Sequence, residues 1–206
     1  MSQVRIAAFK RELKDIGSLT GILGIIPKDF LNIVHGMDAY VRTFYLKDKQ
    51  GKKRQMATAS DTRLEAIHRM LQRKILSKVS VPSSMHGYRR GRSTVTHSRN
   101  HVGAAYIARF DIKDCFPSIF SGRITLMYES LGASPLVAQW LTQLTTWKQR
   151  LPLGFSTSND IANVIMAPMV KRLEHFCVGR GLKVSFYADN IEISGGARVK
   201  DIKRQI

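Results

Sequence analysis

Two short segments carry acidic side chains where a strand would end, and these are the residues best suited to chemistry. Asp111 follows the apolar run 104–110, and Asp189 stands between the apolar stretches 182–187 and 191–194. Carboxylates exposed at strand ends are poor core residues, but they suit Mg²⁺, which keeps most of its waters and needs only one or two protein carboxylates. Two such ions roughly 3.5 to 4 Å apart can activate a hydroxyl and neutralise a leaving pyrophosphate. The pair therefore predicts two-metal phosphoryl transfer.

The elements around the two acids must bring them together. The run 104–110 has the length and the aromatic and β-branched content of a buried strand. The stretches on either side of Asp189 predict a hairpin with this residue at its tip. If the hairpin lies beside the first strand in one sheet, the two acids meet. Because Asp is an ordinary turn residue, either segment alone favours a structural role, whereas both together favour a metal site.

The remaining pattern predicts an α+β protein with a basic first half. Asp61 is expected to cap a helix whose apolar members Leu64, Ile67, Met70, Leu71 and Ile75 recur at helical spacing. Residues 44–46 and 54–58 flank a charged tip at 48–52 and predict a second hairpin. Further helices are expected at 3–15, 28–34, 123–131 and 136–147, and from Thr157 or Ser158 to 176.

Charge indicates a polyanionic partner. The net charge is +18, and residues 41–100 hold 15 Lys and Arg against 3 Asp and Glu. Such clustering is typical of a surface that neutralises phosphates, although any single basic residue more often lies on a solvated face. An anionic membrane surface could also attract it. No apolar run reaches the roughly 18 residues that span a bilayer, and we expect no membrane partner.

Histidine and cysteine patterns carry less weight. His97 and His101 have helical i, i+4 spacing, but no third or fourth ligand is spaced with them, so hydrogen bonding or a phosphate contact is favoured over zinc. The two cysteines, Cys115 and Cys177, indicate a reduced, cytoplasmic protein. Cys177 has no base beyond His175 that would make it a nucleophile.

Several motifs, in order, resemble the palm motifs of reverse transcriptases. They are Phe-Asp-Ile-Lys-Asp-Cys-Phe-Pro-Ser-Ile from residue 110, Leu-Pro-Leu-Gly-Phe-Ser-Thr-Ser-Asn from residue 151 leading to Ala162-Asn163, and Tyr-Ala-Asp-Asn from residue 187. Upstream, 86–93 and 97–101 are similar to fingers motifs of retron-like enzymes. The resemblance runs from about Lys47 to Ser194. It is nearest to the bacterial branch, which includes retron, group II intron, diversity-generating and phage-defence enzymes.

The resemblance implies a catalytic set around the acids. Asp111, Asp189 and the Ile112 carbonyl would be the metal ligands, with Mg²⁺ as the cofactor and Mn²⁺ as an alternative ion. Asn190 occupies the position where the family usually has a second Asp, so one negative charge near the metals is absent. That acid is commonly the less indispensable one in such polymerases.

The resemblance also implies how the deoxynucleotide would be bound. Phe116 matches the position whose ring excludes a ribose 2′-hydroxyl, and Lys53 with Arg54 matches the residues that clamp the triphosphate. Gly154 would allow close approach to nucleotide or primer. Leu153 stands where the family usually has Gln. Diversity-generating enzymes likewise have an apolar residue at this position. Contacts to the RNA template and the DNA or RNA primer would come from Arg69, Arg73, Tyr88, Arg89, Arg90 and Arg92.

The expected architecture is a right-hand polymerase without a thumb. Residues 1–100 would form basic fingers with an N-terminal helical region. Residues 101–206 would form an incomplete palm whose antiparallel sheet carries the catalytic hairpin, with fingers elements contributed by 120–150. A missing C-terminal thumb or a partner protein would complete it. The primary hypothesis is an RNA-directed DNA polymerase. A noncatalytic nucleic-acid-binding module and a structural partner in a defence or mobile-element complex stay open.

Overall fold

A computed structural model describes residues 13–47, 51, 53–197 and 199–202, and it confirms an α+β protein with two antiparallel sheets. The chain divides into two compact units. Unit 1 comprises residues 1–80 and 116–162, and unit 2 comprises residues 81–115 and 163–206. The helix expected at 3–15 lies almost entirely outside the described residues. Within the described part of the chain, no helix has the length and apolarity needed to cross a bilayer.

Unit 1 combines helices with a two-stranded ribbon. Asp61 caps the long helix as expected, because its Oδ1 accepts a hydrogen bond from the Arg63 N–H at 2.7 Å. Leu64, Ile67 and Leu71 of this helix are buried. The elements are α1 (Ile16–Leu23), α2 (Pro27–His35), η1 (Met37–Tyr40), β1 (Val41–Lys47), β2 (Lys53–Ala59), α3 (Thr62–Lys74), η2 (Leu76–Lys78), α5 (Ser121–Ser130), α6 (Pro135–Thr145) and the first residues of α7 (Ser158–Val178).

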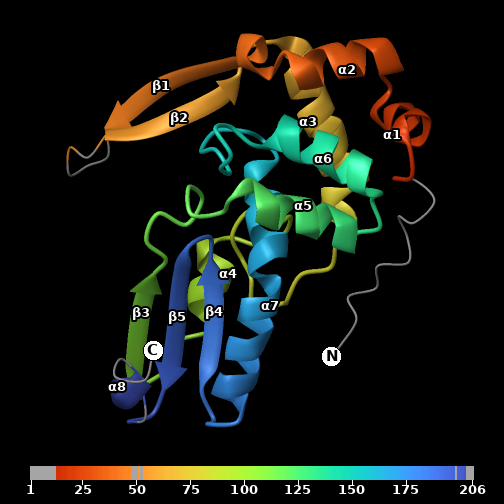
Figure 1. Ribbon diagram of the computed structural model, residues 1–206. Coiled ribbons are helices and arrows are strands. Elements are labelled where there is room, and N and C mark those ends of the chain that lie inside the picture. The colour runs from red at the N-terminus through yellow and green to blue at the C-terminus, as the bar shows by residue number, and fades with distance from the viewer. Residues whose placement is uncertain (1–12, 48–50, 52, 198, 203–206) are drawn as a thin grey trace. The chain divides into compact units, whose positions relative to one another are not determined.

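The ribbon of β1 and β2 is the first predicted hairpin, and Figure 1 shows it as a long antiparallel pair. Its register runs from Val41 opposite Ala59 to Lys47 opposite Lys53. Apolar side chains on it are unusually exposed, with Tyr45 at 64% and Leu46 at 51%. The ribbon therefore presents apolar and basic side chains together, rather than one buried and one solvated face.

Unit 2 is built on a three-stranded antiparallel sheet of order β3-β5-β4 (Figure 1). This arrangement confirms that the hairpin around Asp189 pairs with the strand that ends at Asp111. The elements are α4 (Thr94–Arg99), β3 (Tyr106–Asp111), most of α7, β4 (Lys183–Tyr187), β5 (Asn190–Gly195) and α8 (Val199–Ile202).

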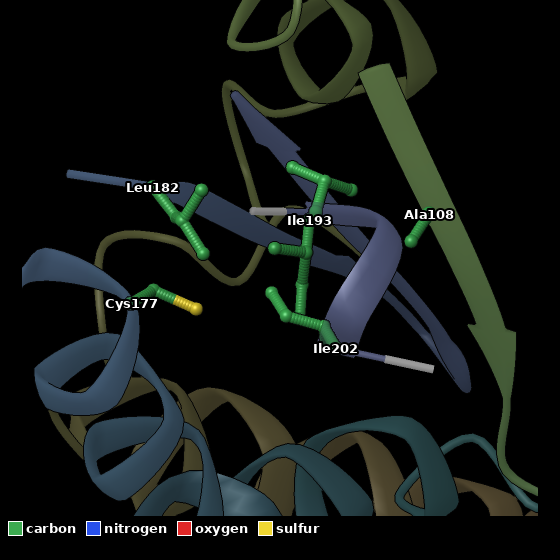
Figure 2. Packing of buried hydrophobic residues seen from close by; sticks show 6 residues of the cluster. Ala108, Cys177, Leu182, Ile193 and Ile202 are labelled. Carbon is green, nitrogen blue, oxygen red and sulfur yellow. The ribbon is translucent and has the colours of Figure 1, made fainter. Parts of the chain in front are cut away.

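One face of this sheet carries the apolar core of unit 2. Ala108 and Ile193 project from the sheet, Cys177 from α7 and Ile202 from α8, and these side chains converge beside Leu182 (Figure 2). Val199 completes the buried cluster. Burying these groups offsets the entropy of ordering the sheet, at about 25 cal/mol per Å² of apolar surface. The sheet that presents the acids therefore has its own hydrophobic support.

The expectation of a fully buried β3 is wrong. Tyr106 is 38% exposed and Ile107 is 54% exposed, whereas Ala108 is buried. β3 is an edge strand of the sheet, and only its alternate residues face the core, so its continuous apolar run does not correspond to burial on both faces.

Candidate active site

The sheet of unit 2 places the two acid-bearing segments side by side. Asp111 is the last residue of β3 and lies opposite Asn190, the first residue of β5. Asp189 lies in the turn between β4 and β5, and its carbonyl accepts a hydrogen bond from the Ile112 N–H at 3.0 Å. Directly opposed residues of an antiparallel pair have Cα atoms about 4.5 to 5.5 Å apart. Antiparallel pairing therefore closes the long sequence gap between the acids.

The turn that carries Asp189 is held at the β4 edge by residues 84–87. The His86 N–H donates to the Phe186 carbonyl at 2.7 Å, and the Phe186 N–H donates to the Ser84 carbonyl at 2.9 Å. At Gly87, an added Cβ would overlap the Ala188 amide nitrogen and lie 3.0 Å from the Ala188 Cα. Ala188 itself has a φ of 56°, in the left-handed region. The turn is thus tightly constrained.

Asn163 supports the same turn from α7. Its Nδ2 donates to the Gly87 carbonyl at 3.1 Å, and the side chain is buried. Sequence reasoning noted Asn163 and Gly87 only as members of motifs and assigned them no role. The only signal was their position in the sequence: Gly87 is the glycine of the His-Gly-Tyr motif, and Asn163 lies in the first turns of a helix, with nothing to show that they meet.

The charges of the acids reach neighbouring side chains. Burial raises the pKa of the Cys115 thiol to about 11, and the negative charges of Asp189 and Asp111 add to the rise. The pKa of Tyr88 is also raised, first by burial and then by Asp189. Both groups therefore stay protonated at neutral pH, and the negative potential at the strand ends favours a bound cation.

Asn190 contacts the acid beside it. Its Nδ2 donates to Asp189 Oδ1 at 3.2 Å. An amide at this position orients the Asp189 carboxylate without adding a second negative charge. The Asp111 side chain is exposed and that of Asp189 is partly exposed, so both carboxylates are accessible from solvent.

The residues expected to bind the nucleotide lie in unit 1. Lys53 and Arg54 begin β2 and are exposed. The Leu153 carbonyl accepts a hydrogen bond from the Ala57 N–H at 2.8 Å. Gly154 has a φ of 116°, and a Cβ there would lie 2.7 Å from the Ala57 carbonyl oxygen. The close approach that requires this glycine is therefore to the backbone of β2. Phe116 is 7% exposed.

The basic residues expected to bind nucleic acid differ in their exposure and in the contacts that they make within the protein. Arg89 Nη1 donates to the carbonyls of Pro82 at 2.8 Å and Met85 at 3.1 Å, which ties it to the segment beneath the turn. Arg69 pairs with Glu65 one helical turn away at 3.0 Å. Arg73, Arg90 and Arg92 are exposed, as is Tyr88 at 49%.

Comparison with known proteins gives a consistent answer. The family model for reverse transcriptase (RNA-dependent DNA polymerase) matches residues 46–202. The chain is 29% identical to Retron Ec86 reverse transcriptase of Escherichia coli over 161 residues, which cover 77% of this chain and 50% of that relative. It is 27% identical to Retron Se72 reverse transcriptase of Salmonella heidelberg over 180 residues, covering 87% of this chain and 48% of the relative. Retron Mx65 reverse transcriptase of Myxococcus xanthus is 29% identical over 171 residues, covering 74% and 40%. The chain thus spans about half the length, or less, of these curated relatives.

Proposed function

The chain belongs to the reverse transcriptase family, with bacterial retron enzymes among its relatives, and from this premise we propose that it carries the nucleotidyl-transfer centre of an RNA-directed DNA polymerase. Its substrates would be deoxynucleoside triphosphates, an RNA template and a DNA or RNA primer. The observation that carries the proposal is the pairing of the Asp111 strand end with the Asp189 turn in one sheet.

The donor set at these strand ends fits magnesium. Asp111 and Asp189 offer accessible carboxylate oxygens, the Ile112 carbonyl is a further candidate, and hard oxygen donors are the ligands that Mg²⁺ and Mn²⁺ prefer. When bound, two such ions supply activation of the primer hydroxyl and neutralisation of the leaving pyrophosphate. Asn190 would hold the Asp189 carboxylate in orientation through its 3.2 Å hydrogen bond.

The other residues would bind and select the nucleotide. Lys53 and Arg54 would contact the triphosphate through charge-assisted hydrogen bonds, which are shorter and about twice as strong as neutral ones. The Phe116 ring would exclude the 2′-hydroxyl, and Leu153 and Gly154 would line the nucleotide beside β2. Nucleic acid would be held by Arg69, Arg73, Tyr88, Arg90 and Arg92, with Arg89 supporting the segment from within.

We assign the fingers to unit 1 and the palm to unit 2. The proposed fingers then comprise residues 1–80 and 116–162, the latter close to the contribution expected from 120–150, whereas residues 81–100, first expected in the fingers, join the palm. Because the chain spans about half the length of its relatives, a helical thumb, on a further segment or a partner, would complete the polymerase. The proposed setting is the bacterial cytoplasm, with a role in antiviral defence among those open to retron-like proteins.

A noncatalytic nucleic-acid-binding module is the second candidate. The observation that favours it is Asn190, which leaves the site with one formal charge fewer than a second Asp would give. Its basic surface would still bind RNA, because phosphate neutralisation does not depend on the acids.

Primer extension on an RNA template with Mg²⁺ and deoxynucleotides separates the two candidates. Asp111→Asn keeps the shape of the side chain and removes its charge, and Asp38→Asn is the matched control, since Asp38 is an exposed acid of η1. Loss of a residue that merely orients a metal ligand costs about 10- to 100-fold, so we expect Asp111→Asn to lose at least that much. Full extension by Asp111→Asn refutes the metal assignment. RNA binding without extension in the parent protein favours the module.

A further inference from the structure

A cluster of polar side chains is buried on the face of the unit 2 sheet opposite the apolar core. His97 of α4 and His101 of the following turn lie against Ser185 of β4 and against Glu192 and Ser194 of β5, and all five are buried. α4 packs against β4 in the region shown behind the sheet in Figure 1. Arg109 of β3 reaches Glu192 from the solvent side, since 71% of its side chain is exposed. We call these six residues the histidine–serine chain.

The structure brings a third possible metal ligand, Glu192, beside the two histidines, which the sequence did not reveal. The hydrogen bonds of the histidines, however, do not suit a metal site. His97 Nε2 and His101 Nε2 lie 3.2 and 3.8 Å from Glu192 Oε2, and the three candidate ligand atoms lie within 4.8 Å of one another. The Ser185 hydroxyl lies 2.6 Å from His101 Nε2, the nitrogen that a metal would need, and 2.7 Å from His97 Nδ1. A hydroxyl thus occupies the space between the rings.

The hydrogen bonds run in one direction when both imidazoles are neutral. A carboxylate only accepts, so His97 Nε2–H donates to Glu192 and His97 Nδ1 accepts from the Ser185 hydroxyl at 2.7 Å. The Ser185 oxygen then accepts from His101 Nε2–H, and His101 Nδ1 accepts from the Ser194 hydroxyl at 2.6 Å. Arg109 Nε donates to Glu192 Oε1 at 2.8 Å and ends the chain.

Burial supports the neutral state of both rings. It lowers the pKa of His97 and of His101, and in each case it outweighs the opposing effect of the Glu192 charge. An extra proton on His97 would leave its Nε2–H donating to Glu192 but would reverse every donor and acceptor from His97 Nδ1 to Ser194, since the Nδ1 would then donate. The direction in which the hydrogen bonds of the histidine–serine chain donate can therefore be measured from which imidazole nitrogens carry a proton.

The histidine–serine chain links all three strands, two residues along each strand from the level of Asp111 and Asn190. Glu192 lies opposite both Arg109 and Ser185 in the sheet register. Side chains alternate between the faces of a strand, so Asp111, Asn190 and Tyr187 lie on the same face as these three residues, two positions further along. A slip of one residue in β5 would turn Glu192 into the apolar core in place of Ile193. The hydrogen bonds thus oppose any register other than the one that sets Asp111 opposite Asn190.

We propose that His97 and His101 are positioning residues that fix the register of β3, β5 and β4 and so hold Asp111 beside the Asp189 turn. They act through Ser185 and Glu192 and not through contacts with Asp111 or Asp189. The consequence for catalysis rests on the proposed function, whereas the effect on the sheet does not.

Amide hydrogen exchange of the 206-residue protein tests the effect on the sheet. Ser185→Ala removes the central hydroxyl of the histidine–serine chain, and Ser185→Thr retains it. Ser98→Ala is the control on the exposed side of α4. The probe is the Ile112 N–H, which bonds the Asp189 carbonyl, and the reference within unit 2 is the Leu182 N–H, which bonds the Cys177 carbonyl. Leaving buried groups unpaired shifts a local opening equilibrium by about tenfold or more.

We expect Ser185→Ala to speed exchange at Ile112 by about tenfold relative to Leu182, with Ser185→Thr and Ser98→Ala close to the parent protein. Equal acceleration at both amides means general destabilisation and overturns the positioning role, as does an unchanged rate at Ile112. Nitrogen NMR of the imidazoles must show Nε2–H on both rings at neutral pH, and Nδ1–H on either ring overturns the proposed chain.

Two further measurements separate this inference from others. Stoichiometric zinc in the purified protein that is lost in Glu192→Gln would replace the hydrogen-bond chain with a metal centre. Primer extension by the Ser185 variants measures the catalytic consequence. If the parent protein binds RNA but does not extend primers, the noncatalytic module is favoured, and the exchange and NMR results still decide the role of the histidine–serine chain.

Discussion

Replacing Gly87 by alanine should displace the turn that carries Asp189. The added Cβ would lie 3.0 Å from the Ala188 Cα and 3.2 Å from the Tyr187 carbonyl carbon, and nearer still to the Ala188 nitrogen. Carbon atoms in contact prefer separations of about 3.5 to 4.0 Å, so the two carbon contacts alone require a separation of roughly 0.5 to 1 Å, and the nearer Ala188 nitrogen requires roughly 1 Å or more. All the opposing atoms belong to backbone, so no side-chain rotation relieves the overlap.

The displacement has two measurable costs. Overpacking of this kind typically costs about 1 to 3 kcal/mol, and the His86 N–H bond to the Phe186 carbonyl lies next to the overlap. A misplacement of about 1 Å at a catalytic group can lower the rate by about 100-fold. We therefore expect Gly87→Ala to reduce extension far more than its loss of stability would explain.

Denaturant unfolding and primer extension are the two assays, and Gly122→Ala is the matched control. Gly122 lies in α5, where an added Cβ meets nothing within 4 Å, and alanine in a helix is favoured over glycine by up to about 1 kcal/mol. Amide chemical shifts of Ile112 and Asn190 report the position of the turn directly. Parent-like shifts together with a free energy of unfolding within about 0.5 kcal/mol of the parent would refute the close packing on which the reasoning depends.

Three further results are expected. Gly154→Ala should lower the free energy of unfolding by about 1 to 3 kcal/mol, because its Cβ would lie 2.7 Å from the Ala57 oxygen at a φ of 116°; thermal unfolding measures this, and an unchanged midpoint contradicts it. Acid should weaken unit 2. Burial lowers the pKa of His86 in the folded protein to about 4, and the charge of Arg92 adds to this effect. As the pH falls below about 6.5, the unfolded protein therefore takes up a proton before the folded protein does, and the free energy of unfolding drops until about pH 4. Unfolding titrations at intervals across this range check the slope, which should flatten above pH 7 if this group dominates. The Cys115 thiol, with its pKa raised to about 11, should react with a thiol reagent at pH 8 only after unfolding, and rapid labelling of the native protein at this residue would contradict its burial.

Local pattern was sufficient for most elements of the fold. The Asp61 cap, the apolar spacing of α3 and the two hairpins are determined by neighbouring residues, and the structure has each of them. Such features depend on propensities and turn chemistry that act over a few residues. The long-range pairing of β3 with the Asp189 hairpin, by contrast, was implied only by the resemblance to reverse transcriptase palms.

The sequence could not indicate the degree of burial of β3 or the support beneath the acids. An apolar run is the same in sequence whether the strand is central or at the edge, and only the strand order shows that β3 has one covered face. Gly87 meets Ala188, and Asn163 meets Gly87, through contacts between segments far apart in the chain. The function of both residues is invisible until the sheet is assembled.

The histidine pair shows the same division most clearly. The sequence determined two imidazoles at helical spacing, two acids at strand ends and a strongly basic first half. Only the tertiary structure decided that Glu192, Ser185 and Ser194 complete the hydrogen bonds of His97 and His101, because β-sheet register sets which distant side chains share a face. Residue types fix the chemistry available to a chain, and long-range pairing fixes which of those groups meet.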